Sequence, residues 1–269
     1  MEGLDEYERE QAILLELEST GRVMVNGLAS RFGVSAVTIR KDLDALERRS
    51  LLRRIRGGAV SAGNADEGAW SMRVRHSAEA KQGIAAAAAE LVRHGDTIAL
   101  DSSTTCFYLA NCLLDRRNLV VVTNGLRTAR LLMDGSNAMV VLPGGVLRRS
   151  SESLVGPIGD LLSGRGRIRK GFFGLVGLST ELGLLDVSVD EAHTKRLLGA
   201  ACDEVYGLFD HSKADRFALH SFVETDRITA LYTDAGIDAA VVAEWREAGV
   251  EIRTAGPVAR VSTIHPDTA

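Results

Sequence analysis

The feature that most constrains this chain is a series of short apolar runs that recur along its last two thirds. They are TIALD (97–101), LVVVTN (119–124), AMVVLP (138–143), GFFGLVGL (171–178), EVYGLFD (204–210) and ITALYTD (228–234). Apolar runs of this length are typical of strands that are buried on both faces. Helical patterns separate them, and an alanine-rich segment from Lys81 to Val92 predicts a closely packed helix before the first. This alternation predicts an α/β domain with a mainly parallel sheet.

The first sixty residues show a different pattern, of short helices and turns. Residues 6 to 18 have apolar residues at helical spacing, and a short strand is expected over Arg22 to Val25. We expect Asn26 to cap a brief helix that ends at Gly33.

Ser35 is expected to cap a third helix, whose buried face is made by Ile39, Leu43 and Leu46. Thr38, Arg40 and Lys41 then point outward. A short helix, a glycine turn and a second helix with a basic outer face are typical of a helix-turn-helix that enters the major groove of DNA. Arg40 is the best candidate to contact a base, because arginine can bond both acceptors of a guanine edge.

The segment LLRRIRGGAV follows and predicts a small β-wing. Its Arg53, Arg54 and Arg56 would contact the DNA backbone. The net charge of the chain is -4, yet the segment from Arg31 to Arg56 holds eight basic and three acidic residues. The simpler alternative is that these basic residues are only solvated charges on a small helical domain.

The stretch GRVMVNGLASRFGVSAVTIRKDLDALERRSLLRRIRGGAV resembles the DNA-binding module of the DeoR family of bacterial regulators. The family has a TIRRDL-like recognition helix, here Thr38 to Leu43, followed by an RxxGGA wing, here Arg54 to Ala59. Lys41 stands where arginine is usual, and Ser50 where glycine is usual.

A length of 269 residues favours two domains, and the small, polar segment SAGNADEGAW (61–70) suits a connection between them. We therefore expect a winged helix-turn-helix domain over residues 1–62 and a connecting segment over 63–80. An effector-binding and oligomerisation domain is expected over 81–269.

Polar residues follow four of the expected strands, at the sheet edge where α/β domains bind ligands. The first such segment is DSSTT, which comprises Asp101, Ser102, Ser103, Thr104 and Thr105 and leads into a helix. It predicts either a phosphate site at the helix N-terminus or a simple helix cap. The other segments contain Thr123, Asn124 and Gly125; Pro143, Gly144 and Gly145 with Arg148; and Asp210, Ser212 and Lys213.

The same segments resemble the effector domain of the DeoR family, in which DSGTT, TNS, a glycine turn and DxSK occupy these places, together with an acidic and lysine helix that matches EAHTK. The resemblance implies a fold similar to ribose-5-phosphate isomerases and CoA transferases, and a phosphorylated sugar as effector. It implies that Ser102 to Thr105 hold the phosphate with Lys213. The sugar side would be lined by Asn124, Arg148, Glu191, Lys195 and Asp210. Gly125 and Ser103 depart from the family pattern.

Several classes of function and site are not indicated. No apolar run approaches the roughly 20 residues of a membrane helix and the start is acidic, so we expect a cytoplasmic protein. Cys106, Cys112 and Cys202 lack CxxC spacing and are expected to be reduced thiols. No metal or other cofactor is expected. His193, His211, Trp70 and Trp245 are interpreted as surface or packing residues.

The leading hypothesis is a DNA-binding transcription regulator, a homo-oligomeric repressor of a carbohydrate operon that is controlled by a phosphorylated sugar. One alternative is a sugar phosphate isomerase or CoA-transferase-like enzyme, with Glu191 as base and Lys213 as phosphate clamp, that carries a DNA-binding module. Another is a nonspecific architectural DNA binder.

Overall fold

The computed structural model describes residues 6–20, 22–48, 52–61, 70–156, 167–214, 216 and 218–256. The chain divides into two compact units, Met1–Ala69 and Trp70–Ala269. Two helices that begin within the expected connecting segment 63–80 lie in the second unit. They are α4 (Trp70–Arg75) and α5 (Ala78–Ala89). No helix among the described residues has the length and apolar character that a membrane span requires.

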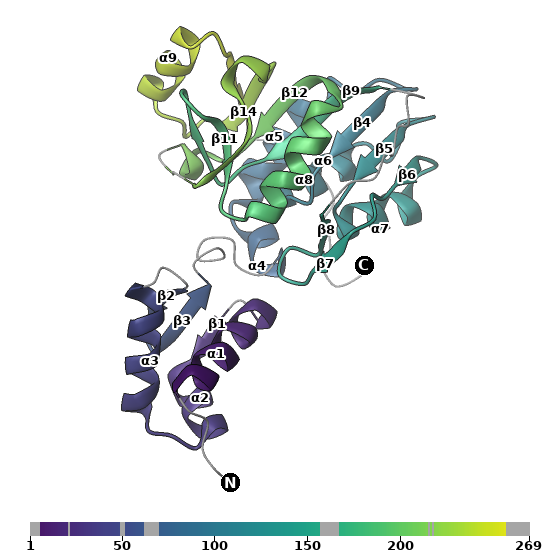
Figure 1. Ribbon diagram of the computed structural model, residues 1–269. Coiled ribbons are helices and arrows are strands. Elements are labelled where there is room, and N and C mark those ends of the chain that lie inside the picture. Colours follow the sequence, from purple (N-terminus) through teal and green to yellow (C-terminus); the bar gives the residue numbers. More distant parts are fainter. Residues whose placement is uncertain are drawn as a thin grey trace. The chain divides into compact units, whose positions relative to one another are not determined.

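The first unit is a winged helix-turn-helix (Figure 1). Its elements are α1 (Glu6–Thr20), β1 (Arg22–Met24), α2 (Val25–Phe32), α3 (Ala36–Arg48), β2 (Leu52–Ile55) and β3 (Gly58–Ser61). The strands form an antiparallel sheet in the order β1-β3-β2, in which β2 and β3 make the predicted wing. Gly58 permits this sheet because a Cβ there would lie 2.0 Å from the carbonyl oxygen of Val23.

The helix ends of this unit confirm one predicted cap and correct another. The Ser35 Oγ accepts the backbone N–H of Thr38 at 3.0 Å, as expected at the start of α3. The Asn26 cap is wrong: α2 begins at Val25, directly after β1, and its N-cap residue Met24 makes no side-chain cap bond. The helix begins one residue before Asn26, at Val25, whose side chain is buried in the core of the unit.

The core of the first unit joins all three helices. The predicted inward residues Ile39, Leu43 and Leu46 of α3 are fully buried with Ile13 of α1. The guanidinium of Arg9 reinforces this packing with two bonds to the buried Asp42 carboxylate, at 2.9 and 3.1 Å. The recognition helix is thus fixed from its inner side.

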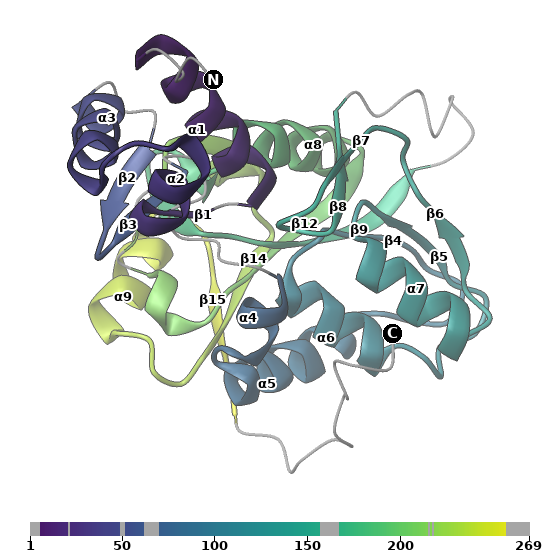
Figure 2. The same cartoon turned by 90° about the horizontal axis from the view of Figure 1, so that it is seen from below.

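The second unit is built on the predicted parallel sheet, which has seven strands in the order β15-β14-β12-β9-β4-β5-β6 (Figures 1 and 2). These strands are β4 (Thr97–Leu100), β5 (Val120–Thr123), β6 (Met139–Val141), β9 (Ile168–Gly174), β12 (Cys202–Leu208), β14 (Ala230–Asp234) and β15 (Ile252–Ala255). The helices that accompany them are α6 (Thr104–Cys112), α7 (Leu126–Gly135), α8 (Val189–Ala200) and α9 (Ala239–Glu247), besides α4 and α5.

Alternate side chains of the sheet enter two separate cores. Phe172 packs with Ile98 and the helices α5 and α6 on one face, whereas Phe173 packs with α8 and Trp245 of α9 on the other. The alanines Ala85, Ala88 and Ala89 bring α5 close to its neighbours, as the alanine run predicted. Burial on both faces explains why the strands are apolar throughout.

One predicted strand is partly wrong, and several short strands were not predicted. The apolar run 171–178 does not form one strand, because β9 ends at Gly174 and the chain enters a second sheet at Gly177. That sheet comprises β10 (Gly177–Ser179), β11 (Gly183–Asp186) and β13 (His220–Val223). A hairpin of β7 (Val146–Arg148) and β8 (Ser153–Val155), the edge strand β15, and the short helices η1 (His211–Lys213) and η2 (Thr225–Arg227) complete the unit.

Candidate functional site

The polar residues predicted to gather at one sheet edge do so in the structure. Asp101, Asn124 and Asp210 directly follow or closely follow the parallel strands β4, β5 and β12. All three side chains are buried. Since the strands are parallel, their carboxyl ends share this edge, and α6 begins there at Thr104.

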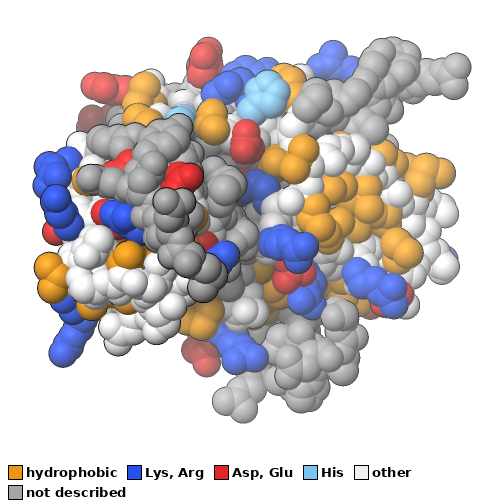
Figure 3. All heavy atoms as spheres, turned by 60° about the horizontal axis from the view of Figure 1, so that its bottom comes forward, with side chains coloured by type: hydrophobic (Ala, Val, Ile, Leu, Met, Phe, Trp, Pro, Cys, Tyr) orange, Lys and Arg blue, Asp and Glu red, His pale blue; other side chains and the backbone are white. Residues whose placement is uncertain are grey.

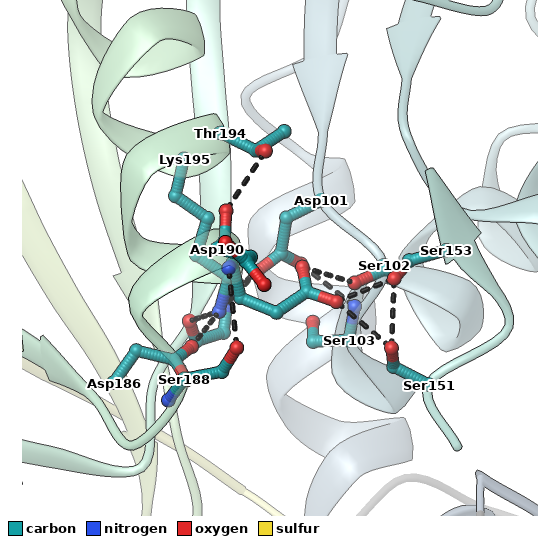
Figure 4. Close-up of polar contacts among 12 residues, drawn as sticks. Asp101, Ser102, Ser103, Ser151, Ser153, Asp186, Ser188, Asp190, Thr194 and Lys195 are labelled. Atoms are coloured by element: carbon teal, nitrogen blue, oxygen red, sulfur yellow. Dashed lines mark hydrogen bonds and ion pairs between the residues drawn. The ribbon is translucent and has the colours of Figure 1, made fainter. Parts of the chain in front are cut away.

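Lys195 lies at the centre of the first of two networks at this edge. Its Nζ contacts Asp186 Oδ2 at 2.7 Å, Asp101 Oδ2 at 3.0 Å and the Gly174 carbonyl oxygen at 2.9 Å (Figure 4). Burial alone would lower the pKa of Lys195, but the carboxylates of Asp186, Asp101 and Glu191 together raise it above its ordinary value. The ammonium is therefore charged, and these three contacts engage its three donors inside the protein.

Glu191, one turn earlier on α8, lies at the centre of the second network. Its Oε1 accepts bonds from Ser151 at 2.8 Å, from Arg148 at 3.0 Å and from Ser153. Its Oε2 accepts bonds from Ser102 and from Asn124 Nδ2, both at 3.3 Å. Glu191 thus joins the hairpin β7–β8 to the ends of β4 and β5, and Figure 4 shows three of its partners, Ser102, Ser151 and Ser153, lying close together.

Some residues of the segment DSSTT bond within the fold, and others have hydroxyls without a partner among the described residues. Asp101 accepts the N–H groups of Ser103 and Gly174, at 3.0 and 2.9 Å, and the Ser103 Oγ caps α6 by accepting the Cys106 N–H. The simple-cap interpretation therefore holds for Ser103. Thr104 and Thr105 are buried in the first turn of α6, and their hydroxyls form no hydrogen bond with any described residue.

A group of three cations, Lys81, Arg73 and Lys213, adjoins this edge, and sequence reasoning identified only Lys213 among them. Lys81, in the first turn of α5, is buried and donates to the carbonyl oxygens of Arg73 and His76, at 2.6 and 2.7 Å. Burial lowers the pKa of Lys81 to about 8; the Asp210 carboxylate opposes this shift, and the charges of Lys213 and Arg73 add to it. Charged residues in a helix such as EAKQG are normally solvated, so the sequence offered no sign that Lys81 is buried.

Other predicted site residues have mainly structural positions. The Thr123 Oγ1 accepts the Gly125 N–H, and a Cβ on Gly125 would lie 2.9 Å from the Cα of Ser102. Gly145 has a φ of 140° at the start of the hairpin β7–β8, and Gly144 beside it is exposed. His193 is exposed, while His211 forms a surface ion pair with Asp234.

The first unit presents the predicted basic surface on α3. Arg40 and Lys41 are exposed, and Ser35 and Thr38 join their hydroxyls at 2.8 Å at the start of the helix. Arg54, predicted to contact the DNA backbone, also makes contacts within the first unit. Its guanidinium donates to the carbonyl oxygens of Arg40 and Gly58 and pairs with Asp44, so it holds the wing against α3.

Comparisons with known proteins agree with this arrangement. Residues 9–64 match the model of the DeoR-like helix-turn-helix domain, and residues 76–235 match that of the DeoR C terminal sensor domain. The chain belongs to the DeoR family. It is therefore a DNA-binding transcription regulator and not an enzyme, so the isomerase or transferase alternative is set aside.

Two curated relatives of this DeoR-family chain are similar over nearly its full length. The HTH-type transcriptional regulator GolR of Listeria innocua is 33% identical over 93% of this chain and 98% of that protein. The glycerol-3-phosphate regulon repressor of Escherichia coli K12 is 31% identical over 86% of this chain and 92% of that protein. Among solved structures, ribose 5 phosphate isomerase A from Neisseria gonorrhoeae is similar with a TM-score of 0.36 and 14% identity. That match covers 50% of this chain and 52% of the isomerase.

The Lys195 network makes a testable prediction about stability. Lys195→Met leaves the buried carboxylates of Asp101 and Asp186 without their cation, and we expect it to lower the free energy of unfolding by about 3–5 kcal/mol. Arg196→Met, the next residue of α8 and exposed, is the matched control and should stay within about 1 kcal/mol of the parent. Urea unfolding followed by tryptophan fluorescence measures both, since both tryptophans belong to the second unit. Equal midpoints for the two variants would contradict the structural role of Lys195.

Proposed function

We propose that this regulator is a repressor whose DNA binding is controlled by a phosphorylated sugar held at the carboxyl edge of the parallel sheet. The observation that carries the proposal is the combination at this edge of a helix N-terminus, two buried threonine hydroxyls without a hydrogen-bond partner among the described residues, and the group of cations. The name of the glycerol-3-phosphate regulon repressor supports the same class of effector. The proposed cellular location is the cytoplasm.

The phosphate is assigned to the N-terminus of α6. Unpaired N–H groups and the helix dipole favour an anion there, and the hydroxyls of Thr104 and Thr105 add two donors. Lys213, half-buried on η1, supplies a cation. Because Ser102 and Ser103 already bond within the protein, we assign them to shaping this loop and Thr104 and Thr105 to direct contact.

The sugar is assigned to the groups around Asn124. The Asn124 Oδ1 is buried and has no hydrogen-bond partner among the described residues, so it can accept a bond from a sugar hydroxyl. Arg148 and Asp210 adjoin the same edge, while Glu191 and Lys195 orient their neighbours. A ligand here can shift DNA binding only through different affinities for two states of the protein, typically about 1–3 kcal/mol.

Binding of phosphorylated sugars tests the effector assignment directly. Glycerol 3-phosphate, ribose 5-phosphate and fructose 6-phosphate are compared with glycerol, ribose and fructose in thermal unfolding of the full chain. We expect a phosphorylated compound alone to stabilise the protein, by about 2.7 kcal/mol at 100 times its dissociation constant. Lys213→Ala should reduce this shift and leave DNA affinity without ligand unchanged. If no phosphorylated compound shifts the unfolding temperature or changes DNA binding, the effector assignment is wrong and a nonspecific DNA binder is favoured.

DNA recognition is assigned to the exposed face of α3, with Ser35, Thr38, Arg40 and Lys41, and to the wing. Arg53 and Arg56 are exposed on or beside β2 and are placed to contact phosphates, while Arg54 positions the wing. In this assignment residues 1–62 bind DNA, and residues 81–269 bind the effector together with α4 and α5, which begin within the expected connecting segment 63–80.

Two neighbouring residues of α3 separate base contact from phosphate contact. Arg40→Ala should abolish the sequence preference at one base position, worth about 1–3 kcal/mol. Lys41→Ala should weaken binding to all DNA sequences alike. It should also reduce the slope of the logarithm of the binding constant against the logarithm of the salt concentration by about 1. Selection from random DNA followed by titration at several salt concentrations measures both effects. An unchanged preference in Arg40→Ala would show that the base contact lies elsewhere.

We propose that the regulator acts as a dimer or tetramer, since helix-turn-helix proteins read half-sites related by two-fold symmetry. Apolar side chains gather on one face of the second unit (Figure 3). Exposed apolar residues of this unit include Met133 of α7, Met139 of β6, and Val146 and Leu147 of β7, each more than half exposed. Surfaces of this kind are typical of subunit interfaces.

Val146→Asp should therefore lower the sedimentation coefficient of the assembly, because it places a charge on this apolar surface. A wild type that sediments as a monomer at micromolar concentration would contradict the proposal.

A further inference from the structure

Arg73 carries an unsatisfied binding edge that the assigned site does not use. Its Nε and Nη2 atoms are buried and have no hydrogen-bond partner among the described residues. These two nitrogens lie on one side of the planar guanidinium, the side that meets two oxygens of a phosphate in parallel. Buried donors without partners are rare and destabilising, so the pair points to an anion that it can bind.

Arg73 adjoins the buried Lys81, whose pKa is affected by more cations than carboxylates. The Arg73 carbonyl oxygen accepts a bond from the Lys81 ammonium at 2.6 Å, and the charges of Lys213 and Arg73 lower the pKa of Lys81 while that of Asp210 raises it. The groups linked in this way are three cations and one carboxylate. A phosphate monoester carries about -1.5 to -2 at pH 7, so its charge is opposite in sign to that of most of these groups.

Arg73 belongs to a helix that packs on α6, the helix whose N-terminus is assigned to the phosphate. Trp70 of α4 is buried and meets the ring of Phe107 edge-on, with ring centroids 5.0 Å apart. The Tyr108 hydroxyl donates to the carbonyl oxygen of Val74 at 2.9 Å. These contacts pack α4 against α6 through Trp70 and Val74, which lie on either side of Arg73 in the sequence.

We propose that the Nε–Nη2 edge of Arg73 binds the phosphate of the effector, which makes α4 part of the effector site. This inference rests on the proposed function, since it names the anchor of the same ligand. Both nitrogens are shielded from solvent. A phosphate can therefore reach them only if Arg73 or the residues that cover it move. Because α4 directly follows residues 62–69, its movement on binding is the signal that passes along the chain toward the DNA-binding unit.

Three variants of α4 test the anchor. Arg73→Gln removes the charge and the paired donors, Arg73→Lys keeps the charge without the parallel pair, and Arg75→Gln is the matched control on an exposed neighbour. The probes are inorganic phosphate, glycerol 3-phosphate, ribose 5-phosphate and fructose 6-phosphate, with the unphosphorylated compounds beside them. Isothermal titration of the full chain measures affinity, and urea unfolding checks that each variant folds.

We expect Arg73→Gln to lower the affinity for whichever phosphorylated probe binds the wild type, by about 10- to 100-fold. The affinity of Arg73→Lys should be intermediate, and that of Arg75→Gln should equal that of the wild type. Hydrogen exchange in α4 should change with this probe in wild type and not in Arg73→Gln, which should still bind DNA but respond weakly to the probe. Wild-type binding of inorganic phosphate as tightly as of the esters would support the anchor and identify free phosphate as the ligand.

Three outcomes would overturn the proposal. If Arg73→Gln binds the ester as tightly as wild type while Lys213→Ala has lost it, the effector site stands and Arg73 lies outside it. If Arg73→Gln loses the ester and the unphosphorylated sugar equally, Arg73 does not act through the phosphate. If wild type binds no phosphorylated probe, the inference and the proposed function are both wrong.

Discussion

The carboxyl edge of the second unit depends on the ion pairs of Lys195 with Asp101 and Asp186. These groups come from α8, from the end of β4 and from the end of β11, so one buried ammonium joins the large sheet to the small one. Buried charges are tolerated only when they are paired and hydrogen-bonded, and Asp101 meets this condition with two backbone N–H groups besides the lysine. The same carboxylate therefore fixes where α6 begins and where β9 ends.

Much of this fold could be predicted from the sequence because burial on both faces leaves a clear pattern. Six of the seven strands of the large sheet lie within or overlap apolar runs, and α3 follows from the spacing of Ile39, Leu43 and Leu46. The prediction of one strand over 171–178 was wrong because the apolar residues continue from β9 into β10, which begins at Gly177 and belongs to another sheet. The apolar pattern does not show where the first strand ends and the second begins. The hairpin β7–β8 was missed because its strands are three residues long and partly exposed.

The site shows a different limit of sequence reasoning. The motifs predicted that polar residues gather at one sheet edge, and Asp101, Asn124, Glu191 and Lys195 do meet there. They did not reveal which side chains are engaged within the protein, because that depends on partners such as Ser151 and Asp186 that lie far away in the sequence. Lys81 was missed for a related reason, since its burial follows from packing beneath α4 and not from its own helix.

The polar groups at this edge fall into two physical classes, and a sensor needs both. Glu191 and Lys195 have their hydrogen-bonding capacity met by neighbouring side chains and backbone, so they make the edge rigid and keep its shape without ligand. Asn124 Oδ1 and the guanidinium edge of Arg73 remain unsatisfied, so the free protein bears an unfavourable energy that a ligand of matching chemistry removes. A site in which every polar group already had a hydrogen-bond partner would gain little from binding a ligand. A site without the rigid network would have no fixed geometry with which to select its ligand.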